Sequence, residues 1–580
     1  MASTATQIPQ VETEPDVRET DDLKSLQPLP EALREVCEKY PHLLEYITKL
    51  REAGTGVPEY LTQLSRKMAE RTEPNLIYPV GSNGVFVHIL SDNTGDRHNY
   101  IPIEPITTLE IDELMDHVEE ACISISENIP GINPDIDRQK HLIEFLEQVT
   151  TQKNLPNKSP VSKLLRFRHK KEGNFTGIKV TSRELEGIKY LFIRDKVRMG
   201  VLEPLITDPY IEDISCSGLG NVFIEHKIFK SLKSTINFSN FDELDEFVVR
   251  LAERIRQPVT YKRPIADATL PDGSRINIVY GRDVSKRGSN FSIRKFAEVP
   301  LSIFEIVDFG TINYQMLAYL SVAIANGMNV FVAGESASGK TSLLNALTAF
   351  IPARAKVITI EDTPELQVPH QNWIREVVQT NKSDNVAGTV TMFDLLRAAL
   401  RQRPNEIIVG EIRGKEGNIA FQAMQTGHSV MATFHAATIE KLIQRITGDP
   451  ISVPKSYIDN LNIAVLMGLV RLRNGKTARR VTSVAEIVGW DSLSQTFNIA
   501  EAFKLDESTD TFQFTGFMTS YVMEFKIAPM LGIPNTQKRR IYDELDRRAM
   551  IFNKLHKERG VTGFYEVLDV LSKAQKDGLF

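Results

Sequence analysis

The chain has few cysteines, and this scarcity excludes whole classes of protein. Its 580 residues include three, Cys37, Cys122 and Cys216, which lie far apart and are odd in number. Cysteines without paired spacing argue against a disulfide framework and against a zinc knuckle, and they fit a reducing compartment. We therefore expect a cytoplasmic protein whose fold depends on packing rather than on cross-links.

Long apolar runs are also missing. No stretch reaches the roughly 18 consecutive apolar residues of a membrane-spanning helix. The longest runs, near Val330 and at Ile463 to Val470, are short enough to be buried strands or a core helix. Residues 1–10 are polar and show no signal-peptide pattern. If the protein works at a membrane, we expect it to dock there on a partner.

The chain also lacks a large excess of charge of either sign, with 69 basic and 75 acidic residues. The formal net charge is -6, so whole-chain basicity gives no support for binding nucleic acid, and we expect no stable nucleic-acid partner. Hydrophobic residues make up 42% of the chain and charged residues 25%, which is typical of globular proteins. A chain of 580 residues exceeds one ordinary core, and roughly two to four domains are expected.

The N-terminal part is predicted to hold a tail and a small domain. Residues 1–30 are acidic, carry several prolines and lack aliphatic periodicity, which predicts a disordered acidic tail. Residues 31–155 predict an α+β N-terminal extension that begins with a helical pattern from Leu33 to Arg71. Its later elements are expected at 84–90 and 100–105 (strands) and at 111–127 (helix). Asn154 to Pro160 is a polar linker candidate.

Residues 160–300 predict a mixed α/β domain. Gly220 to Lys230 alternates like a strand, and Phe241 to Arg256 reads as an amphipathic helix. Leu270 to Gly273 contains proline and glycine at turn spacing and predicts a tight turn. Two more strands are expected, at 275–280 and 291–294.

Residues 301–580 predict an α/β domain with a C-terminal helical part. Strand and helix patterns alternate up to Asp449, which implies a mostly parallel sheet. A helix should stop at Asn326-Gly327. The strands are expected at 329–333, 356–361, 406–409 and 430–434. Farther along, Asn474-Gly475 predicts a hairpin turn, and two helical stripes follow, at Ile541 to Phe552 and Phe564 to Leu571.

A phosphate-binding loop is the strongest motif. It follows an apolar strand and opens a helix, so its backbone N–H groups and the positive end of the helix dipole would face bound phosphates. Lys340 would reach the β and γ phosphates of ATP, and the Thr341 hydroxyl would bind Mg²⁺. The residues assigned to nucleotide binding are Gly334, Glu335, Ser336, Ala337, Ser338, Gly339, Lys340, Thr341 and Ser342.

Two acidic elements and two histidines follow the loop. Glu361 and Glu365 flank the end of one expected strand, and Glu411 ends another, which we expect to neighbour the strand before the loop. Phosphoryl transfer to water needs one carboxylate to activate the water and one to order the metal. His428 and His435 flank the next strand. One of them could sense the γ-phosphate, although a structural role is the more common use of a histidine.

These elements in this order resemble the secretion-type traffic ATPases of type II and type IV secretion, pilus and archaellum motors. The resemblance covers roughly Lys189 to Gly448. Within this superfamily the chain looks most like the archaeal branch. The reasons are the segment Asp362-Thr363-Pro364, which is followed by His370 to Trp373, and the segment Glu486 to Trp490 in the C-terminal part. The other segments that carry it are Ile211 to Ile214, Leu270 to Arg275, Ser292 to Phe296, Glu361 to Glu365, Leu396 to Arg401, Gly410 to Gly414 and Gly427 to Ala436.

The resemblance implies a fold and a set of roles. The fold would be a RecA-like ATPase domain preceded by a PAS-like mixed α/β domain, assembled as a homo-hexameric ring that binds ATP between the two domains of each subunit. Glu411 would take the Walker B role at Mg²⁺, and Glu361 or Glu365 would activate water, with both candidates open. Arg275 and Arg294 match arginines that neutralise charge at the γ-phosphate. His435 belongs to the histidine box.

The implied function is an ATP hydrolase that moves its domains and passes the motion to a polytopic membrane platform protein, at the inner face of the cytoplasmic membrane. Pilus assembly, archaellum rotation and secretion all fit this description. A DNA-transfer ATPase is an alternative that would need a basic, aromatic-bearing surface. A scaffold that binds nucleotide without hydrolysing it is another, and the intact Lys340, Thr341, Glu365 and Glu411 argue against it.

Overall fold

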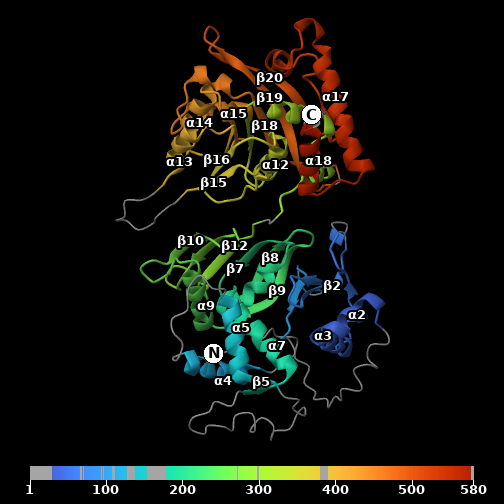
Figure 1. Ribbon diagram of the computed structural model, residues 1–580, viewed down its shortest axis with the longest axis vertical. Helices are drawn as coiled ribbons and strands as arrows, with labels where there is room; N and C mark the ends of the chain where they lie inside the picture. The colour runs from blue at the N-terminus through green and yellow to red at the C-terminus, as the bar shows by residue number, and fades with distance from the viewer. Residues whose placement is uncertain are drawn as a thin grey trace. The chain divides into compact units, whose positions relative to one another are not determined.

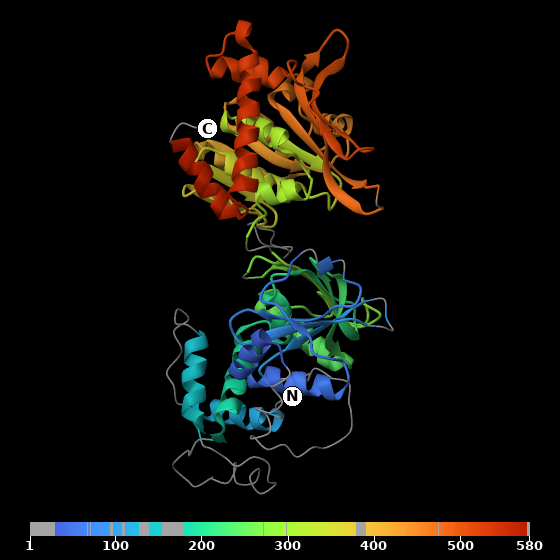
Figure 2. The ribbon, with the colours of Figure 1, turned by 90° about the vertical axis from the view of Figure 1, so that its right-hand side faces the viewer.

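The computed structural model describes residues 29–576 except for 66–67, 70, 93–94, 96, 107–110, 127–137, 153–177, 271, 297–298, 379–389 and 474. The chain forms two compact units, unit 1 (Met1–Phe296) and unit 2 (Ala297–Phe580). Figures 1 and 2 show the ribbon of each unit. Residues 1–28 of the expected acidic tail, and the linker expected at 154–160, lie outside the described residues. The fourfold division expected from the sequence stays a prediction.

Unit 1 is built on a ten-stranded sheet of the described residues, in the order β1-β2-β3-β4-β9-β8-β7-β12-β11-β10. The strands up to β4 and the strands from β7 onward share this sheet, because β4 pairs parallel with β9 at Asn99–Lys233 and Tyr100–Ser234. The strands are β1 (Glu59–Tyr60), β2 (Asn75–Val80), β3 (Val85–Leu90), β4 (Asn99–Ile103), β7 (Ile211–Cys216), β8 (Gly220–His226), β9 (Lys230–Phe238), β10 (Ile265–Thr269), β11 (Arg275–Val279) and β12 (Asn290–Arg294).

The helices of unit 1 cover this sheet and a smaller parallel pair, β5 (Thr150–Gln152) with β6 (Ile178–Val180). The expectation of a helical pattern up to Arg71 is wrong, because the helix ends at Glu52. Gly54 and Gly56 there have left-handed backbone (φ 73° and 79°), which ends a helix, and β1 follows. The helices are α2 (Glu31–Lys39), α3 (Pro41–Glu52), α4 (Asp112–Ser126), α5 (Arg138–Val149), α7 (Ser182–Phe192), α8 (Glu203–Thr207) and α9 (Phe241–Arg254).

Unit 2 is built on a nine-stranded sheet of the described residues, ordered β15-β14-β16-β17-β13-β18-β19-β20-β21. The pairs from β15 to β18 are parallel, which confirms the expected α/β class, and the pairs from β18 to β21 are antiparallel. The strands are β13 (Val330–Gly334), β14 (Val357–Glu361), β15 (Trp373–Val377), β16 (Glu406–Ile412), β17 (Ser429–Phe434), β18 (Ile463–Arg471), β19 (Thr477–Asp491), β20 (Thr496–Asp506) and β21 (Thr511–Gln513).

Helices cover both faces of the unit 2 sheet (Figure 1). Successive residues of the fully buried strand β13 enter different cores, Val330 and Val332 one and Phe331 and Ala333 the other, as the two-residue period of a strand requires. The first core packs against α10 (Ile303–Asp308), α11 (Tyr314–Ala325), α12 (Lys340–Leu347), α17 (Arg539–Asn553) and α18 (Phe564–Lys576). The second packs against α13 (Met392–Ala399), α14 (Glu416–Gln425) and α15 (Ile439–Thr447).

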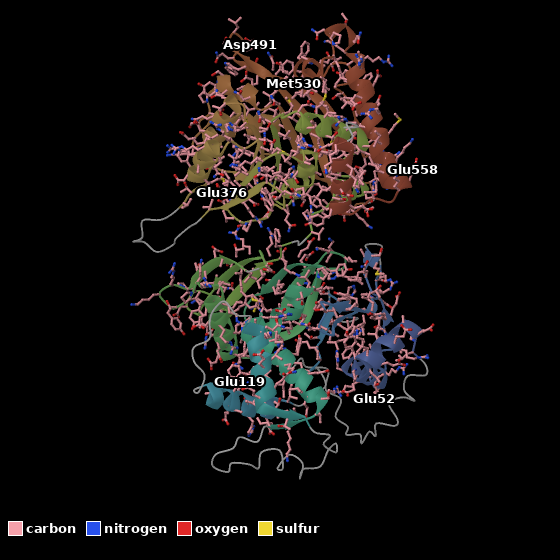
Figure 3. All side chains as sticks on the ribbon, viewed as in Figure 1. Glu52, Glu119, Glu376, Asp491, Met530 and Glu558 are labelled. Atoms are coloured by element: carbon pink, nitrogen blue, oxygen red, sulfur yellow. The ribbon has the colours of Figure 1, made fainter. Side chains whose placement is uncertain are left out.

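The side chains in Figure 3 mark the extent of unit 2. Asp491, which ends β19, and Glu376, on the edge strand β15, lie at opposite ends of the unit. The helix before β13 ends at Ala325 and is followed by the left-handed Gly327 (φ 73°), as expected. In the part of the chain that the structure describes, no helix is both long and apolar enough to cross a bilayer.

Candidate functional site

The phosphate loop joins the end of β13 at Gly334 to the start of α12 at Lys340. Its backbone is left-handed at Ala337 (φ 61°) and at Gly339 (φ 93°), the residue that precedes α12. A Cβ atom on Gly334 would lie 2.5 Å from the carbonyl oxygen of Met467 on β18, so only glycine fits there. The tight loop and the helix that starts from it form the kind of site at which backbone N–H groups bind phosphate.

The side chains of the loop fold over one carbonyl group. Lys340 Nζ and Ser338 Oγ each donate to the Glu335 carbonyl oxygen at 2.8 Å. Ser338 is fully buried, whereas Glu335, Ser336 and Ala337 are exposed. Burial lowers the pKa of Lys340, the nearby Glu411 carboxylate raises it and Arg413 lowers it further. Thr341 is half-buried and Ser342 is exposed in the first turn of α12.

Glu361 is the buried carboxylate of the site, at the end of β14. Its Oε1 accepts the backbone N–H groups of Glu365 and Leu366, both at 2.8 Å, and so it fixes the loop that follows the strand. Its Oε2 lies 3.8 Å from Arg375 Nε on β15. Burial raises the pKa of Glu361 to about 7, against the lowering effect of the two backbone hydrogen bonds and of Arg375.

Glu365 lies on the same loop but is exposed. Its backbone N–H is held by Glu361, so the direction of the loop at Glu365 is set by a buried group while its carboxylate faces solvent. The two glutamates that the sequence leaves open as alternatives therefore differ. One organises the loop, and the other presents an accessible carboxylate.

Glu411 projects from an irregular stretch of β16. The register between β16 and β17 shifts between Val409 and Ile412, and the Gly410 carbonyl accepts a hydrogen bond from Thr433 Oγ1 at 2.5 Å. Arg413 links two motifs, because its guanidinium lies 2.5 Å from Glu411 and 3.4 Å from Asp362. The expectation that this strand neighbours β13 is wrong, since β17 pairs with both strands and lies between them.

The two histidines lie at different ends of β17. His435 follows its carboxyl end, where its Nε2 lies 3.1 Å from Ser336 Oγ of the phosphate loop. Arg445 donates to the His435 carbonyl and stacks on the ring of Phe434, which holds this segment. His428 precedes the strand and pairs with Thr426 at 3.1 Å. Six strand residues separate the two rings by about 20 Å, so only His435 belongs to the loop's surroundings.

Arg275 and Arg294 lie in unit 1, where they form a cross-strand pair. They are register partners on β11 and β12, and both side chains are exposed. Arg294 Nε lies 3.1 Å from Asp213 on β7, the next strand. The turn before β11 is closed by the Gly273 N–H and the Leu270 carbonyl at 2.9 Å, with Gly273 left-handed (φ 88°). Two arginines directly opposite each other place two positive charges on one face of the sheet, and Asp213 offsets one of them.

Sequence reasoning did not find Arg479 on β19, which reaches the phosphate loop. Its Nε donates to the Ala337 carbonyl at 2.9 Å. The signal available was weak, because Arg479 and Arg480 form an ordinary basic pair in a strand and stand far from the motifs in sequence. Only the antiparallel pairing of β18 with β19 brings Arg479 beside the loop.

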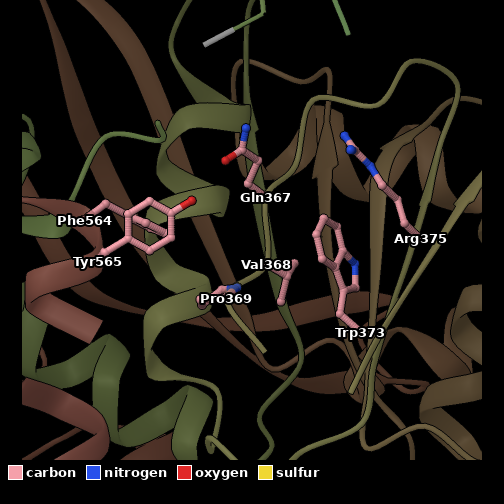
Figure 4. A pocket seen from close by; sticks show the side chains of 7 residues that line it. All are labelled: Gln367, Val368, Pro369, Trp373, Arg375, Phe564 and Tyr565. Atoms are coloured by element: carbon pink, nitrogen blue, oxygen red, sulfur yellow. The ribbon is translucent and has the colours of Figure 1, made fainter. Parts of the chain in front are cut away.

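A cavity of about 180 Å³ lies beside the loop that follows β14 (Figure 4). Tyr565 and Trp373 face each other across Val368 and Pro369, and Arg375 stands at the rim. Binding pockets for whole ligands measure about 300–1,000 Å³, so this one is too small for a nucleotide. Arg375 connects it to Glu361, 3.8 Å away.

The residues of the phosphate loop fit a nucleotide with Mg²⁺. Gly334 and Gly339 leave the space that a Cβ would fill, and a lysine and a threonine hydroxyl stand at the start of α12. Within the described ranges, no three His, Cys, Asp or Glu residues group to hold a metal by themselves.

Comparison with known proteins identifies a family and several similar proteins. A family model described as "Type II/IV secretion system protein" matches residues 195–492. The uncharacterized protein MJ0900 of Methanocaldococcus jannaschii is 40% identical over 555 residues, which cover 94% of this chain and 97% of that protein. The type IV secretion system protein VirB11 of Bartonella quintana is 32% identical over 242 residues, 36% of this chain and 67% of that protein. The crystal structure of the Brucella suis VirB11 ATPase with sulphate is 24% identical and covers 49% of this chain and 92% of its own, with a TM-score of 0.25.

Proposed function

This chain belongs to the type II/IV secretion ATPase family, and we propose that it hydrolyses ATP and converts the free energy into domain motion. The observation that carries the proposal is the set of groups around the phosphate loop of unit 2. Lys340 lies near Glu411, and Gly334 of the loop leaves no room for a Cβ. The loop that carries the exposed Glu365 reaches α12, where the Gln367 N–H donates to Asn345 Oδ1 at 3.1 Å. Positioned charges of this kind are what phosphoryl transfer requires from a protein.

Each group has one role in the proposed reaction. Lys340 and the loop N–H groups hold the β and γ phosphates, and Thr341 and Glu411 would hold Mg²⁺, which supplies positive charge to the phosphate oxygens. Glu365 orients a water and accepts its proton as the water oxygen bonds to the γ-phosphorus. The bond from that phosphorus to the β–γ bridging oxygen breaks, and ADP and phosphate leave. Glu361 keeps the loop of Glu365 in place through two hydrogen bonds.

The remaining candidate residues are proposed to respond to the γ-phosphate. His435 is hydrogen-bonded to Ser336, so loss of the γ-phosphate would change the hydrogen bonding of both side chains. We propose that Arg275 and Arg294 supply positive charge to the transition state. Lysine substitutes should replace them poorly, since a compact ammonium lacks the planar fork of a guanidinium.

The output that we propose is assembly or rotation of a type IV pilus-like filament, or secretion, driven through a polytopic membrane platform protein. A homo-hexameric ring that works at the inner face of the cytoplasmic membrane is part of the proposal. Family membership and the printed names of relatives such as VirB11 support it. The net charge of -6 disfavours DNA as cargo, and the accessible Glu365 disfavours a scaffold that does not hydrolyse ATP.

The decisive experiment measures ATP hydrolysis as a function of protein concentration, beside Lys340→Ala and with oligomer mass followed in parallel. We expect activity per subunit to rise as a six-subunit species forms, and to vanish in the variant. Equal activity per subunit in a stable monomer would contradict the ring. Nucleotide binding without hydrolysis, even with membranes added, would favour the scaffold.

A further inference from the structure

Arg479 is a charged side chain beside the phosphate loop that the proposed reaction does not use. It lies on β19 directly across from Leu469 of β18, and β18 itself pairs with β13. Its Nε donates to the carbonyl of Ala337, which is a non-glycine residue in the left-handed region. Figure 1 shows β18, β19 and β20 as the continuation of the sheet that carries the loop.

The contact acts on a peptide group that belongs to the loop. The Ala337 carbonyl and the Ser338 N–H are two ends of the same peptide unit. A cationic donor on the carbonyl polarises that unit and strengthens its N–H as a donor. In the structure this N–H donates to the Glu335 carbonyl at 3.4 Å, so the polarised hydrogen bond is one that helps to hold the shape of the loop. The Arg479 contact also opposes relaxation of Ala337 out of its left-handed conformation, which L-residues adopt rarely.

The position of Arg479 is itself fixed by its neighbour. Arg480 is buried and, as the next residue of β19, points to the opposite face of the sheet from Arg479. It forms two hydrogen bonds to Asp510, at 2.7 and 2.8 Å. It also donates to the carbonyls of Phe309, at 2.8 Å, and of Arg479, at 3.0 Å. The stem of Arg479 packs on the loop, because a Cβ on Gly339 would lie 3.3 Å from its Cδ.

We propose that Arg479 is a positioning residue that holds the phosphate loop in its anion-binding shape from outside. The inference rests on the proposed function, because the ligand whose affinity it sets is the nucleotide. The carbonyl that it binds is part of the loop and not of the reacting groups. Arg479 therefore affects ground state and transition state equally and changes nucleotide affinity rather than turnover at saturation.

The test uses the full chain and compares four variants, Arg479→Ala, Arg479→Gln, Arg471→Ala and Lys340→Ala. Calorimetry measures the Kd for ADP with Mg²⁺, steady-state assays give kcat for ATP, and thermal unfolding checks the fold. We expect Arg479→Ala to weaken ADP binding by about fivefold to tenfold, with kcat within twofold and an unchanged unfolding temperature. Arg479→Gln keeps an N–H donor and should recover part of the affinity. Arg471, on the same hairpin and exposed, is the matched control and should change nothing.

Three results would overturn the positioning role. If Arg479→Ala binds ADP as tightly as Arg471→Ala does, the contact has no effect on the loop. If kcat falls while affinity holds, or if Gln recovers nothing, the charge acts on the nucleotide directly. Failure of the proposed function has a different signature, because the unchanged chain would then bind ADP without hydrolysing ATP, or Lys340→Ala would bind ADP as tightly as the unchanged chain does.

Discussion

The two halves of the unit 2 sheet serve the phosphate loop in different ways. The parallel half supplies chemical groups at the carboxyl ends of its strands, Glu361 at the end of β14, Glu411 on β16 and His435 after β17. The antiparallel half supplies a contact to the backbone of the loop, Arg479 on Ala337, and β18, the strand that the two halves share, places the Met467 carbonyl against Gly334. One half provides the reacting charges and the other supports the shape of the loop.

This difference follows from strand direction. Parallel strands end at the same edge of a sheet, so loops distant in sequence meet there and can carry separate reacting groups. An antiparallel strand passes alongside its neighbour and presents side chains and carbonyls along its length. Changes in the parallel half should therefore alter turnover, whereas changes in the antiparallel half should alter affinity and stability.

The largest effect is expected for Glu365→Gln. Removing the proton acceptor should lower kcat by about a hundredfold or more and leave nucleotide affinity within a few fold. Glu411→Gln changes the proposed Mg²⁺ position, so this variant should also raise the Mg²⁺ concentration needed for activity. Comparing the two variants therefore separates water activation from metal binding. Single-turnover hydrolysis at a series of Mg²⁺ concentrations measures both effects. Full activity in Glu365→Gln would assign the base to another residue.

Gly334→Ala tests the place where the two halves meet. The added Cβ would lie 2.5 Å from the Met467 carbonyl oxygen and 2.7 Å from Ser338 Oγ, so the strand end and the loop must move apart. Strain of this kind costs about 1–3 kcal/mol, and nucleotide affinity should fall at least tenfold. Denaturant unfolding and ADP calorimetry measure the two effects. Gly563→Ala, whose Cβ would meet no atom within 3.4 Å, is the control, and equal behaviour of the two variants would show that the loop tolerates the contact.

Sequence patterns located the parallel half well, because each of its strands is a short apolar run that ends in a motif. β13, β14, β16 and β17 lie within a few residues of the expected ranges. β18 and β19 pair antiparallel as neighbours in sequence, while Asn474 of the hairpin turn expected between them lies outside the described residues. The long strands β19 and β20 were missed, because their registers shift and much of β20 is exposed, which breaks the two-residue alternation. Arg479 was missed with them, and no local pattern distinguishes Glu361 from Glu365, whose difference is burial.

Glu361→Gln should change the pH dependence of stability. Burial raises the pKa of Glu361 to about 7 from an ordinary value of 4.5, so the folded state binds a proton there more tightly than the unfolded state does. This proton stabilises the fold at low pH, and the stabilisation is lost as the pH rises from about 4.5 to 7. The full difference is up to about 3 kcal/mol. Glutamine stays neutral and accepts the same backbone N–H groups, so the variant should gain stability relative to the unchanged chain over that range. Urea titrations measure the free energy of unfolding of both proteins at each pH. If the two free energies change with pH in the same way, the assignment to Glu361 is wrong.

The smallest effect is expected for Asp510→Asn, which tests the Arg480–Asp510 pair that fixes the position of Arg479. Arg480 is buried and loses a charged partner, and a partly exposed pair of this geometry contributes about 1–2 kcal/mol to stability. Lys504→Ala removes an exposed 3.7 Å pair with Glu501 in the same half and should cost under about 0.5 kcal/mol. ADP affinity should fall less in Asp510→Asn than in Arg479→Ala, since the Arg479 contact weakens without being removed. If Asp510→Asn lowered kcat and left stability unchanged, the antiparallel half would take part in the chemistry, and the division between the two halves would be wrong.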